Sequence, residues 1–343
     1  MKFILFCQNS YSFGILAPIK DYLSNNSHAF LWFVNSKILS DFPYSDAPHT
    51  TKISDLIDFR SDVIFVPGNE VPYYLRGLKV QIFHGFAGEK KGHFRIRHYF
   101  DLYLTQGPYF TQEFNRLKSI YKNFDVIETG WPKLDVYGQD DQRYIVEKNK
   151  LLQQFQAQKI IIYAPTFSPK LTSAPFLSRY IKDLAANPNY LVFLKFHPLL
   201  DAKYVALYES IAQEVNNIVL VRDKNIIPYL MMSDLLISDT SSVIYEFLLL
   251  NKPVVSFHNI SRNIFWDNSS EYSELVTKVE SNLTHDYFAA RRLEVYQQYH
   301  PYNDGKSAER MVKAAIGYIK VYGVPEKRKI SILRRWTIMK MFK

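Results

Sequence analysis

The chain has 343 residues, of which 47% are hydrophobic and 22% are charged, and its formal net charge is +9. This length exceeds what one hydrophobic core usually supports, and the composition is that of a globular protein, so we expect two domains and exclude a largely disordered chain. The basic excess is concentrated in residues 326–343, which hold seven Lys or Arg and one acidic residue. Because the rest of the chain is only mildly basic and carries no recognised nucleic-acid module, an anionic lipid surface is the expected partner and nucleic acid is not.

The N-terminal segment does not have the pattern of a secretion signal. Residues 1–8 are mainly apolar, but the polar residues Gln8, Asn9 and Ser10 come too early for a signal-peptide core, and no run of about 18 apolar residues occurs. The single cysteine, Cys7, lies in this apolar run and has no partner for an internal disulfide, which fits a buried thiol in a reducing compartment. We therefore expect a cytoplasmic protein that does not span a membrane.

The first half of the chain contains short apolar runs that end in turn or polar residues and are separated by segments of helical length. This alternation is typical of βαβ units with a buried parallel sheet. The predicted strands are Phe3–Phe6, Leu31–Val34, Asp62–Val66, Val80–Phe83, Leu102–Leu104 and Asp125–Ile127.

A polar, Gln-rich stretch at 138–158 predicts a connecting helix, and a second series of apolar runs follows it. These runs are Lys159–Tyr163, Leu191–Phe196, Ile218–Val221, Leu235–Ser238 and Val254–Phe257. The sequence therefore predicts an α/β protein with two Rossmann-like parallel-sheet domains. We place the domains at residues 1–140 and 141–322, followed by a basic tail at 323–343.

Ligands of open parallel sheets bind beyond the carboxyl ends of the strands, so polar residues there are candidate site residues. Asp239, Thr240, Ser241 and Ser242 follow one predicted strand and precede an apolar segment that reads as a helix. Hydroxyl groups and unpaired backbone N–H groups at a helix start are suited to hold a phosphate or pyrophosphate. Ordinary helix capping by serine is the alternative interpretation.

Two further strand exits in the second half carry polar residues. Lys195 and His197 end one strand, and Pro198 restricts His197 to an extended backbone that lets its ring project. An imidazole takes up a proton from an attacking hydroxyl or stabilises a leaving phosphate, although a strand-end histidine is also a common structural residue. Thr166 occupies the corresponding position after Tyr163 and could donate to phosphate.

In the first half, His84 and Gly85 stand at a strand exit, where glycine permits close approach of a ligand. Basic residues follow, and most of them fit a solvated charged face equally well; they are Lys90, Lys91, His93, Arg95, Arg97 and His98. Near the C-terminus, Asp304 and Lys306 lie in a turn before a helix, where ribose or phosphate contacts and simple helix capping are equal alternatives. The sequence holds no zinc-spaced His and Cys cluster, no GxGxxG, no Walker lysine motif and no GxSxG elbow, so dehydrogenase, NTPase and serine hydrolase activities lack their usual support.

Six short motifs occur together in one order along the chain. They are His84-Gly85, Gly130-Trp131-Pro132-Lys133-Leu134-Asp135, Tyr163-Ala164-Pro165-Thr166, Lys195-Phe196-His197-Pro198, the segment from Asp234 to Ser242, and Asp304-Gly305-Lys306-Ser307. In content and order, between about residues 80 and 320, they resemble the CDP-glycerol glycerophosphotransferase family, which builds teichoic-acid-like polymers and related surface glycans such as capsules. The first 75 residues resemble only the N-terminal half of a GT-B enzyme.

The resemblance implies a GT-B fold, with two Rossmann-like domains facing each other across a cleft, an acceptor-side first domain and a donor-binding second domain. It implies that Thr166, Ser241 and Ser242 hold the donor pyrophosphate and that His84 and His197 are catalytic. Lys195, Asp239, Thr240, Asp304 and Lys306 are the further donor-binding candidates. The reaction would move glycerol phosphate or a related polyol phosphate from a CDP-alcohol to a glycan or lipid-linked hydroxyl and release CMP, without an implied cofactor or metal.

Two departures from the family pattern leave the donor open. Thr240 stands where the family usually has tyrosine, and Trp131 where a smaller residue or tyrosine is common, so ribitol or another alcohol could replace glycerol. A GT-B glycosyltransferase that uses a CMP-sugar, Kdo or sialic acid, is the alternative, with Glu70 as the nearest candidate base. A non-catalytic glycan- or membrane-binding member and a UDP-sugar epimerase are further alternatives.

The apolar residues of Ile330–Phe342 do not form one stripe on a helical wheel, so the sequence does not predict a regular amphipathic helix there. We nevertheless expect this basic, aromatic tail to attach peripherally to the inner face of the cell membrane. A frayed basic tail is the alternative.

Overall fold

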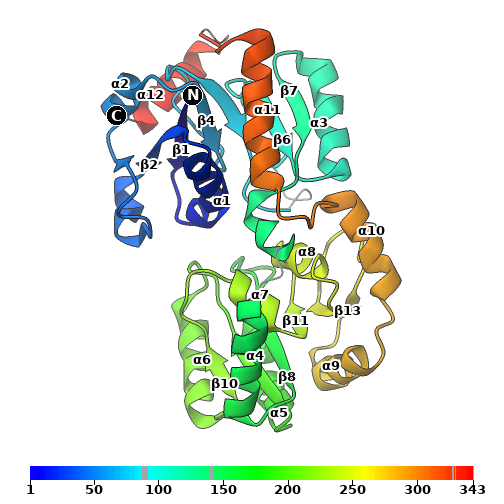
Figure 1. The fold of residues 1–343 in the computed structure, drawn as a ribbon. Helices are drawn as coiled ribbons and strands as arrows, with labels where there is room; N and C mark the ends of the chain where they lie inside the picture. The colour runs from blue at the N-terminus through cyan, green and yellow to red at the C-terminus, as the bar shows by residue number, and fades with distance from the viewer. Residues whose placement is uncertain (87–91, 139–141, 327, 329, 343) are drawn as a thin grey trace. The chain divides into compact units, whose positions relative to one another are not determined.

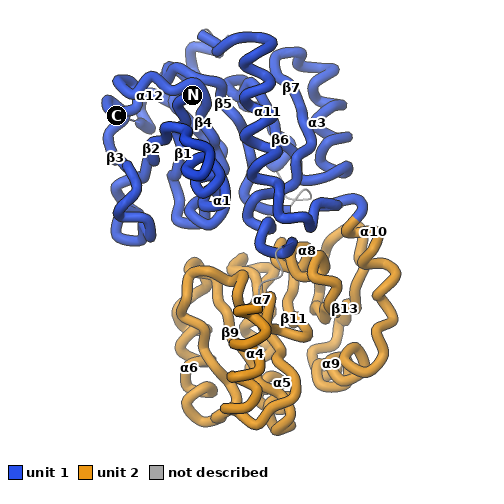
Figure 2. Tube along the Cα trace, viewed as in Figure 1, with its two compact units in different colours: residues 1–139, 297–343 blue, residues 140–296 orange. Residues whose placement is uncertain are grey.

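The computed structural model describes residues 1–343 apart from 87–91, 139–141, 327, 329 and 343. The chain divides into two compact units, of which unit 1 is Met1–Gln139 with Gln297–Lys343 and unit 2 is Asp140–Tyr296 (Figure 2). The expected boundary between residues 140 and 141 lies outside the described residues. The prediction of two parallel-sheet α/β domains is confirmed, because every strand pairing in both sheets is parallel.

In the described part of unit 1, seven strands form one sheet in the order β3-β2-β1-β4-β5-β6-β7 (Figure 1). They are β1 (Lys2–Cys7), β2 (Ala29–Val34), β3 (His49–Thr50), β4 (Val63–Val66), β5 (Leu78–Gln81), β6 (Leu102–Thr105) and β7 (Asp125–Glu128). Between them lie α1 (Tyr11–Asn25), η1 (Ser36–Asp41), α2 (Ile53–Phe59) and α3 (Pro108–Tyr121), and η2 (Pro132–Gly138) follows β7. Strand β4 is apolar and buried along its whole length, and β1 is so from Phe3 to Cys7, because helices cover both faces of a parallel sheet.

Unit 2 repeats this plan with six described strands in the order β10-β9-β8-β11-β12-β13. They are β8 (Lys159–Tyr163), β9 (Tyr190–Leu194), β10 (Ile218–Leu220), β11 (Leu235–Ser238), β12 (Val254–Phe257) and β13 (Asp267–Ser269). The helices of this unit are α4 (Gln142–Phe155), α5 (Ala174–Ala185), α6 (Ala202–Glu214), α7 (Ile227–Met232), α8 (Val243–Leu248), η3 (Tyr272–Glu274), α9 (Leu275–Thr284) and α10 (Ala289–Tyr299), whose last residues belong to unit 1. The connecting helix predicted at 138–158 is α4.

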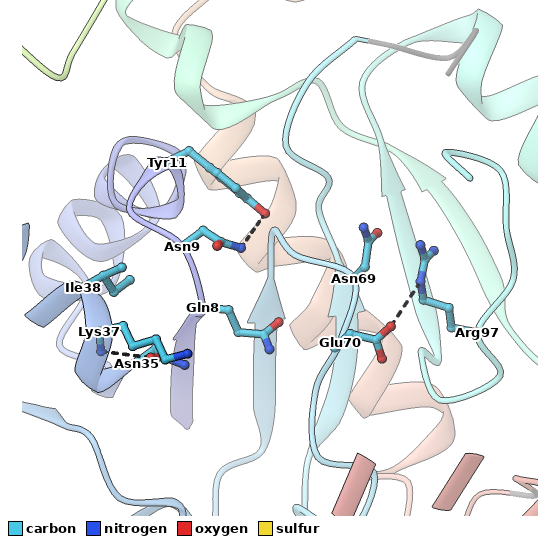
Figure 3. Close-up of a pocket in the computed structure, with 9 residues that line it drawn as sticks. All are labelled: Gln8, Asn9, Tyr11, Asn35, Lys37, Ile38, Asn69, Glu70 and Arg97. Carbon is cyan, nitrogen blue, oxygen red and sulfur yellow. Dashed lines mark hydrogen bonds and ion pairs between the residues drawn. The ribbon is translucent and has the colours of Figure 1, made fainter. Parts of the chain in front are cut away.

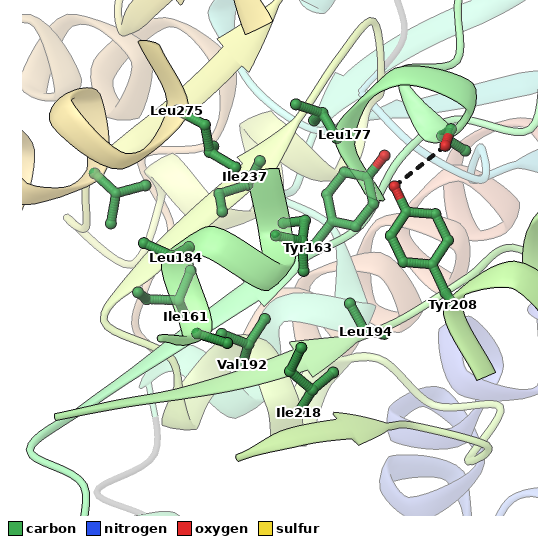
Figure 4. Close-up of a cluster of buried hydrophobic side chains, with 14 of the residues drawn as sticks. Ile161, Tyr163, Leu177, Leu184, Val192, Leu194, Tyr208, Ile218, Ile237 and Leu275 are labelled. Atoms are coloured by element: carbon green, nitrogen blue, oxygen red, sulfur yellow. Dashed lines mark hydrogen bonds between the residues drawn. The ribbon is translucent and has the colours of Figure 1, made fainter. Parts of the chain in front are cut away.

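The core of unit 2 forms where β8, β9 and β11 pack against α5 and α6 (Figure 4). Ile161, Val192 and Ile237 are fully buried there, and Tyr208 of α6 donates a hydrogen bond of 3.1 Å to the carbonyl oxygen of Ala174. This bond ties α6 to the first turn of α5. This apolar packing therefore fixes the positions of the strands whose ends carry the candidate site residues.

Helix α11 (Ser307–Tyr322) was expected in the second domain, but it belongs to unit 1 and packs on α1, η2 and β5. The buried Asp135 of η2 explains this placement, because its two carboxylate oxygens accept hydrogen bonds of 2.8 Å from the backbone N–H groups of Ser307 and Ala308. Gly130 has φ +82, and a Cβ there would overlap the Ser307 hydroxyl. The motifs at 130–135 and 304–307 therefore form one structural joint.

The basic tail also differs from the sequence expectation, since residues Ile332–Met341 form a helix, α12, on unit 1. Ile338 and Phe342 of this segment enter the core of unit 1, while Ile332, Leu333 and Trp336 are 83, 80 and 64% exposed. The apolar residues form no single stripe on a helical wheel because some of them pack into the core of unit 1 and others face the solvent. Three basic residues of the predicted tail, Lys327, Lys329 and Lys343, lie outside the described residues.

Candidate functional site

In each sheet the chain reverses the direction in which it adds strands, and this reversal marks where ligands of such folds bind. In unit 2 the strands proceed from β8 to β9 and β10, and β11 then adds on the other side of β8. In unit 1 the same reversal falls between β1 and β4. The switch point of unit 2 therefore lies at the exits of β8 and β11, where Thr166 and residues 239–242 stand.

Asp239 at the exit of β11 is fully buried and ties the two strand exits together. One carboxylate oxygen accepts from the backbone N–H of Thr166 at 2.8 Å, and the other accepts from the N–H and the hydroxyl of Ser173 at 2.8 and 2.9 Å. Asn259 donates to the Asp239 carbonyl oxygen at 2.6 Å. Asp239 was predicted to bind the donor, and its bonds in the structure fix the loop that carries Thr166.

The three hydroxyl residues after Asp239 have different environments. The hydroxyl of Thr240 accepts the backbone N–H of Ile260 at 3.3 Å. Ser241 and Ser242 are partly exposed, and the side chain of Ser242 makes no capping hydrogen bond to α8. Helix α8 is only six residues long, so its dipole contributes little, and the capping interpretation of these serines finds no support in this hydrogen-bond pattern. Their hydroxyls remain the donor-phosphate candidates.

His197 follows β9, the neighbour of β8 in the sheet, and it joins the same edge. Its exposed ring stacks on Phe167 with ring centroids 4.3 Å apart, which links it to the loop that carries Thr166. The backbone N–H of Leu199 donates to its Nδ1 at 3.1 Å, so the neutral ring carries its proton on Nε2. Lys195 is 9% exposed, and burial lowers the pKa of its ammonium group.

His84 follows β5 in unit 1 and is exposed, and Phe83 before it adopts a left-handed backbone with φ +60. The ring stacks on Tyr11 at 5.1 Å between centroids. Its Nδ1 lies 3.0 Å from the carbonyl oxygen of Pro67, which can only accept, so Nδ1 carries the proton of the neutral ring. Nε2 is then the basic nitrogen, which is the tautomer opposite to that of His197.

Asp304 and Lys306 were predicted to bind the donor in the second domain, but both belong to unit 1. Arg310 donates two hydrogen bonds to Asp304, at 2.7 and 3.0 Å, and this pairing lowers the pKa of the carboxyl group. Arg310 also donates to the carbonyl oxygen of Thr129 at 2.8 Å. Asp304 therefore braces the joint between η2 and α11, and Lys306 is the exposed residue that precedes α11.

Glu70, the alternative candidate base, is held in an ion-pair network. Arg334 of α12 donates to its two carboxylate oxygens at 2.8 and 2.7 Å, Tyr99 donates to it, and the Nε of Arg97 lies 3.9 Å away. These contacts engage both carboxylate oxygens of Glu70. Lys90 and Lys91 lie outside the described residues.

Sequence reasoning missed Ser173 and Phe167, because neither stands directly at a strand exit; both act through Asp239 and His197. In the part of the chain that the structure describes, no group of three His, Cys, Asp or Glu side chains is placed to hold a metal ion. Among the same residues, no helix is both long and apolar enough to cross a bilayer.

The family model for CDP-glycerol:poly(glycerophosphate) glycerophosphotransferase matches residues 87–316, about two thirds of the chain. The chain belongs to this family. The matched range includes both strand exits of the unit 2 switch point and His197, whereas His84 lies just before it. The resemblance inferred from the six motifs is thereby confirmed.

The curated relatives of this chain include teichoic acid primases and polymerases. The chain is 25% identical over 228 residues to the teichoic acid glycerol-phosphate primase of Bacillus subtilis (strain 168), a match that covers 61% of this chain and 56% of that protein. It is 25% identical over 234 residues to the teichoic acid ribitol-phosphate polymerase TarL of Staphylococcus aureus (strain NCTC 8325 / PS 47). This match covers 62% of this chain and 40% of that protein. The chain thus spans about half the length of these relatives.

Solved structures show the same fold at low sequence identity. The wall teichoic acid polymerase TagF superposes with a TM-score of 0.69 at 18% identity, over 94% of this chain and 89% of that one. The UDP-GlcNAc 2-epimerase from Neisseria meningitidis superposes with a TM-score of 0.63 at 15% identity, over 92% of this chain and 100% of that one. The predicted GT-B fold class is confirmed, and the family match rather than the fold separates this chain from sugar epimerases.

We predict that Asp239→Asn lowers the free energy of unfolding by about 1–3 kcal/mol, because the new amide group faces N–H and O–H donors inside the protein. Ser241→Ala, at a partly exposed neighbour, is the control and should change it by less than about 0.5 kcal/mol. Urea unfolding followed by tryptophan fluorescence measures both variants. An Asp239→Asn protein that is as stable as the parent but binds nucleotide more weakly would instead make Asp239 a ligand contact.

Proposed function

We propose that this chain transfers glycerol phosphate, or a related polyol phosphate such as ribitol phosphate, from a CDP-alcohol to a hydroxyl group of a glycan or lipid-linked acceptor and releases CMP. Family membership supports this reaction class, and the relatives named above are primases and polymerases of glycerol- and ribitol-phosphate chains. The products of such chemistry are polymers of the cell envelope, teichoic acids or capsules.

The observation that carries the proposal is the convergence of three neighbouring strand exits in unit 2. Thr166 after β8 and Ser241 and Ser242 after β11 lie at the switch point of the sheet, and His197 after the neighbouring β9 lies at the same edge. Asp239 and the Phe167–His197 ring contact fix the three exits to one another. Hydroxyls, an imidazole N–H and the nearby ammonium group of Lys195 suit a pyrophosphate, whose charge is spread over several oxygens.

The two histidines take different roles because their tautomers differ. His84 presents the basic Nε2 and is suited to accept the proton of the acceptor hydroxyl. His197 presents an Nε2–H and is suited to donate to a phosphate oxygen of the CDP-alcohol. We therefore assign His84 as the general base and His197 as the residue that stabilises charge on the donor phosphate.

The reaction is balanced without another reactant. The acceptor oxygen forms a bond to the β-phosphorus while the bond from that phosphorus to the bridging oxygen breaks. The electron pair of the broken bond leaves with CMP, and the hydroxyl proton goes to His84. The product is a phosphodiester between the acceptor and the polyol. Positioning and charge stabilisation dominate such phosphoryl transfers, so a set of hydrogen-bond donors and one base is a sufficient arrangement.

We further propose that the protein works on the cytoplasmic face of the membrane, to which α12 attaches it. Ile332, Leu333 and Trp336 supply an exposed apolar face, and Arg335 and Lys340 are exposed on the same short helix. Apolar side chains with an aromatic ring and basic residues are the combination that binds an anionic lipid interface. Attachment there brings the enzyme to a lipid-linked acceptor.

We predict that His84→Gln lowers kcat by about 10²–10⁴-fold and leaves the Kd for CDP-glycerol unchanged, because a general base acts on the acceptor. His197→Ala should raise that Kd about tenfold, because it removes a hydrogen bond to a charged group. Calorimetric titration with CDP-glycerol, CDP-ribitol and CMP-Kdo, together with a CMP-release assay, measures both effects. The exposed His285→Gln is the matched control.

Two results would contradict this assignment. Selective binding of CMP-Kdo by the unaltered protein would make the chain a glycosyltransferase. Full transfer activity in both histidine variants would remove the proposed base and the proposed phosphate contact.

For membrane attachment, we predict that Trp336→Glu and Leu333→Glu each reduce sedimentation with phosphatidylglycerol vesicles by about fivefold or more, because each loses apolar insertion and adds a repelled charge. Val146→Glu, at a 64% exposed aliphatic residue of α4, is the control. Binding that is equal for phosphatidylcholine and phosphatidylglycerol vesicles, or unaffected by the two α12 substitutions, would show that α12 does not attach the protein.

A further inference from the structure

The ring of the proposed base His84 is held by two neighbours that belong to other strand exits of unit 1. Tyr11 follows β1 and stacks on the histidine, with ring centroids 5.1 Å apart and planes inclined by 30°. Pro67 follows β4, and its carbonyl oxygen lies 3.0 Å from Nδ1 of His84. The stacking restricts tilting of the imidazole ring, and the hydrogen bond restricts its rotation about the bond to Cβ.

Tyr11 is itself fixed at the start of α1. Its hydroxyl group accepts a hydrogen bond of 3.1 Å from the side chain of Asn9 (Figure 3). The backbone N–H of Ser12 donates to the carbonyl oxygen of Asn9 at 3.0 Å, which closes the turn around Tyr11. A Cβ at Gly68 would lie 3.9 Å from the Tyr11 hydroxyl group, so the loop after β4 passes beside this ring.

A buried glutamine fixes the loop that carries Pro67. Gln81 is the last residue of β5, is 2% exposed and pairs with Val66, the last residue of β4. Its amide nitrogen donates to the carbonyl oxygens of Gly68 and Pro67 at 2.7 and 3.4 Å. A buried amide group needs such hydrogen-bond partners, so the loop and the glutamine fix each other. Gln81 thereby holds the Pro67 carbonyl group where it binds the ring of His84.

The backbone on both sides of His84 is also fixed by the interior of unit 1. Gln106 follows β6, is fully buried and donates from Nε2 to the carbonyl oxygen of Gly85 at 3.0 Å. Phe83 is 5% exposed and adopts a left-handed backbone with φ +60. For a residue with a Cβ this conformation is costly, and it persists only where the surrounding structure fixes it. The base is therefore presented from a backbone with little freedom.

We propose that Tyr11 and Gln81 are positioning residues of the transfer reaction, which hold the ring of His84 so that its basic Nε2 points toward the acceptor hydroxyl group. Gln81 acts through the Pro67 carbonyl oxygen, which binds the proton on Nδ1 and leaves Nε2 unprotonated. Tyr11 acts through the face of its ring. Catalytic side chains work only when neighbouring groups lock their orientation, and this inference rests on the proposed function because it concerns the base of that reaction.

The first test compares transfer with donor binding in variants of the full-length protein. Tyr11→Leu and Gln81→Met should each lower kcat, measured by CMP release, about tenfold or more and leave the Kd for CDP-glycerol unchanged, since they misplace only the base. Tyr11→Phe keeps the ring that stacks, so its kcat should stay within about twofold of the parent value.

Tyr121→Leu is the matched control. Tyr121 is 43% exposed, against 44% for Tyr11, and it also packs on a histidine of unit 1, His98, with ring centroids 5.3 Å apart. Its kcat should equal that of the parent. Gln81→Met removes a buried hydrogen-bonding group, so its Kd for CDP-glycerol also reports whether it folds, and Tyr11→Leu, at an exposed residue, tests the inference even if it does not.

The second test observes the ring without the reaction. Nitrogen NMR of protein labelled only at histidine shows which ring nitrogen carries the proton, and His84→Gln identifies the signals of His84 by their loss. At a pH where the ring is neutral, the parent should have its proton on Nδ1. Gln81→Met should give a mixture of the two tautomers, because the Pro67 carbonyl group is no longer held in place.

The outcomes separate this inference from the proposed function. If the parent transfers polyol phosphate and both Tyr11→Leu and Gln81→Met keep full kcat, with the tautomer of His84 unchanged, the inference is wrong although the proposed function stands. A weaker Kd for CDP-glycerol in Tyr11→Leu, or an equal loss of kcat in Tyr121→Leu, would also overturn it. If the parent transfers nothing but Gln81→Met changes the tautomer, the positioning of the ring stands and the proposed reaction does not.

Discussion

The site of unit 2 depends on the hydrogen bonds that the buried carboxylate of Asp239 accepts from the loop after β8. A parallel sheet brings strand ends to one edge but does not fix the loops that leave them. Asp239 fixes one such loop through the N–H of Thr166 and both donors of Ser173. A buried carboxylate is stable only when it is fully hydrogen-bonded, so this arrangement allows few positions for Thr166 relative to Ser241.

Unit 1 also contains a buried carboxylate that accepts backbone hydrogen bonds from a distant segment. The buried Asp135 accepts the first backbone N–H groups of α11 and thereby returns the C-terminal part of the chain to the first unit. Arg334 of α12 binds another acidic residue of unit 1, Glu70. In both units acidic side chains thus join segments that lie far apart in the sequence.

The sequence alone predicted the α/β class, most of the strands, and the strand exits that carry His84, His197 and Ser241. These predictions succeed because buried parallel strands are continuous apolar runs, and their ends are marked by polar residues. The strands β3 and β13 were missed because they have two and three residues and are largely polar. The places of α11 and α12 could not be predicted, because they depend on Asp135 and Glu70, contacts of more than 150 residues in sequence separation.

The contacts of the acidic site residues within the protein could not be predicted for a related reason. The sequence does not show which groups the carboxylates of Asp239 and Asp304 bind, and only the structure places Asp239 against Thr166 and Asp304 against Arg310. The opposite tautomers of His84 and His197 also depend on backbone atoms of Pro67 and Leu199 that no motif records.

The central claim, transfer of a polyol phosphate, is tested most directly by following the β-phosphate of the donor. CDP-glycerol carrying radioactive phosphorus only in its β-phosphate would be incubated with the protein and a lipid-linked glycan acceptor. The account predicts that the label enters the acceptor while the CMP released is unlabelled. Label that leaves in CDP, or that appears only in free glycerol phosphate, would contradict it, because the β-phosphate would then not have moved to an acceptor hydroxyl.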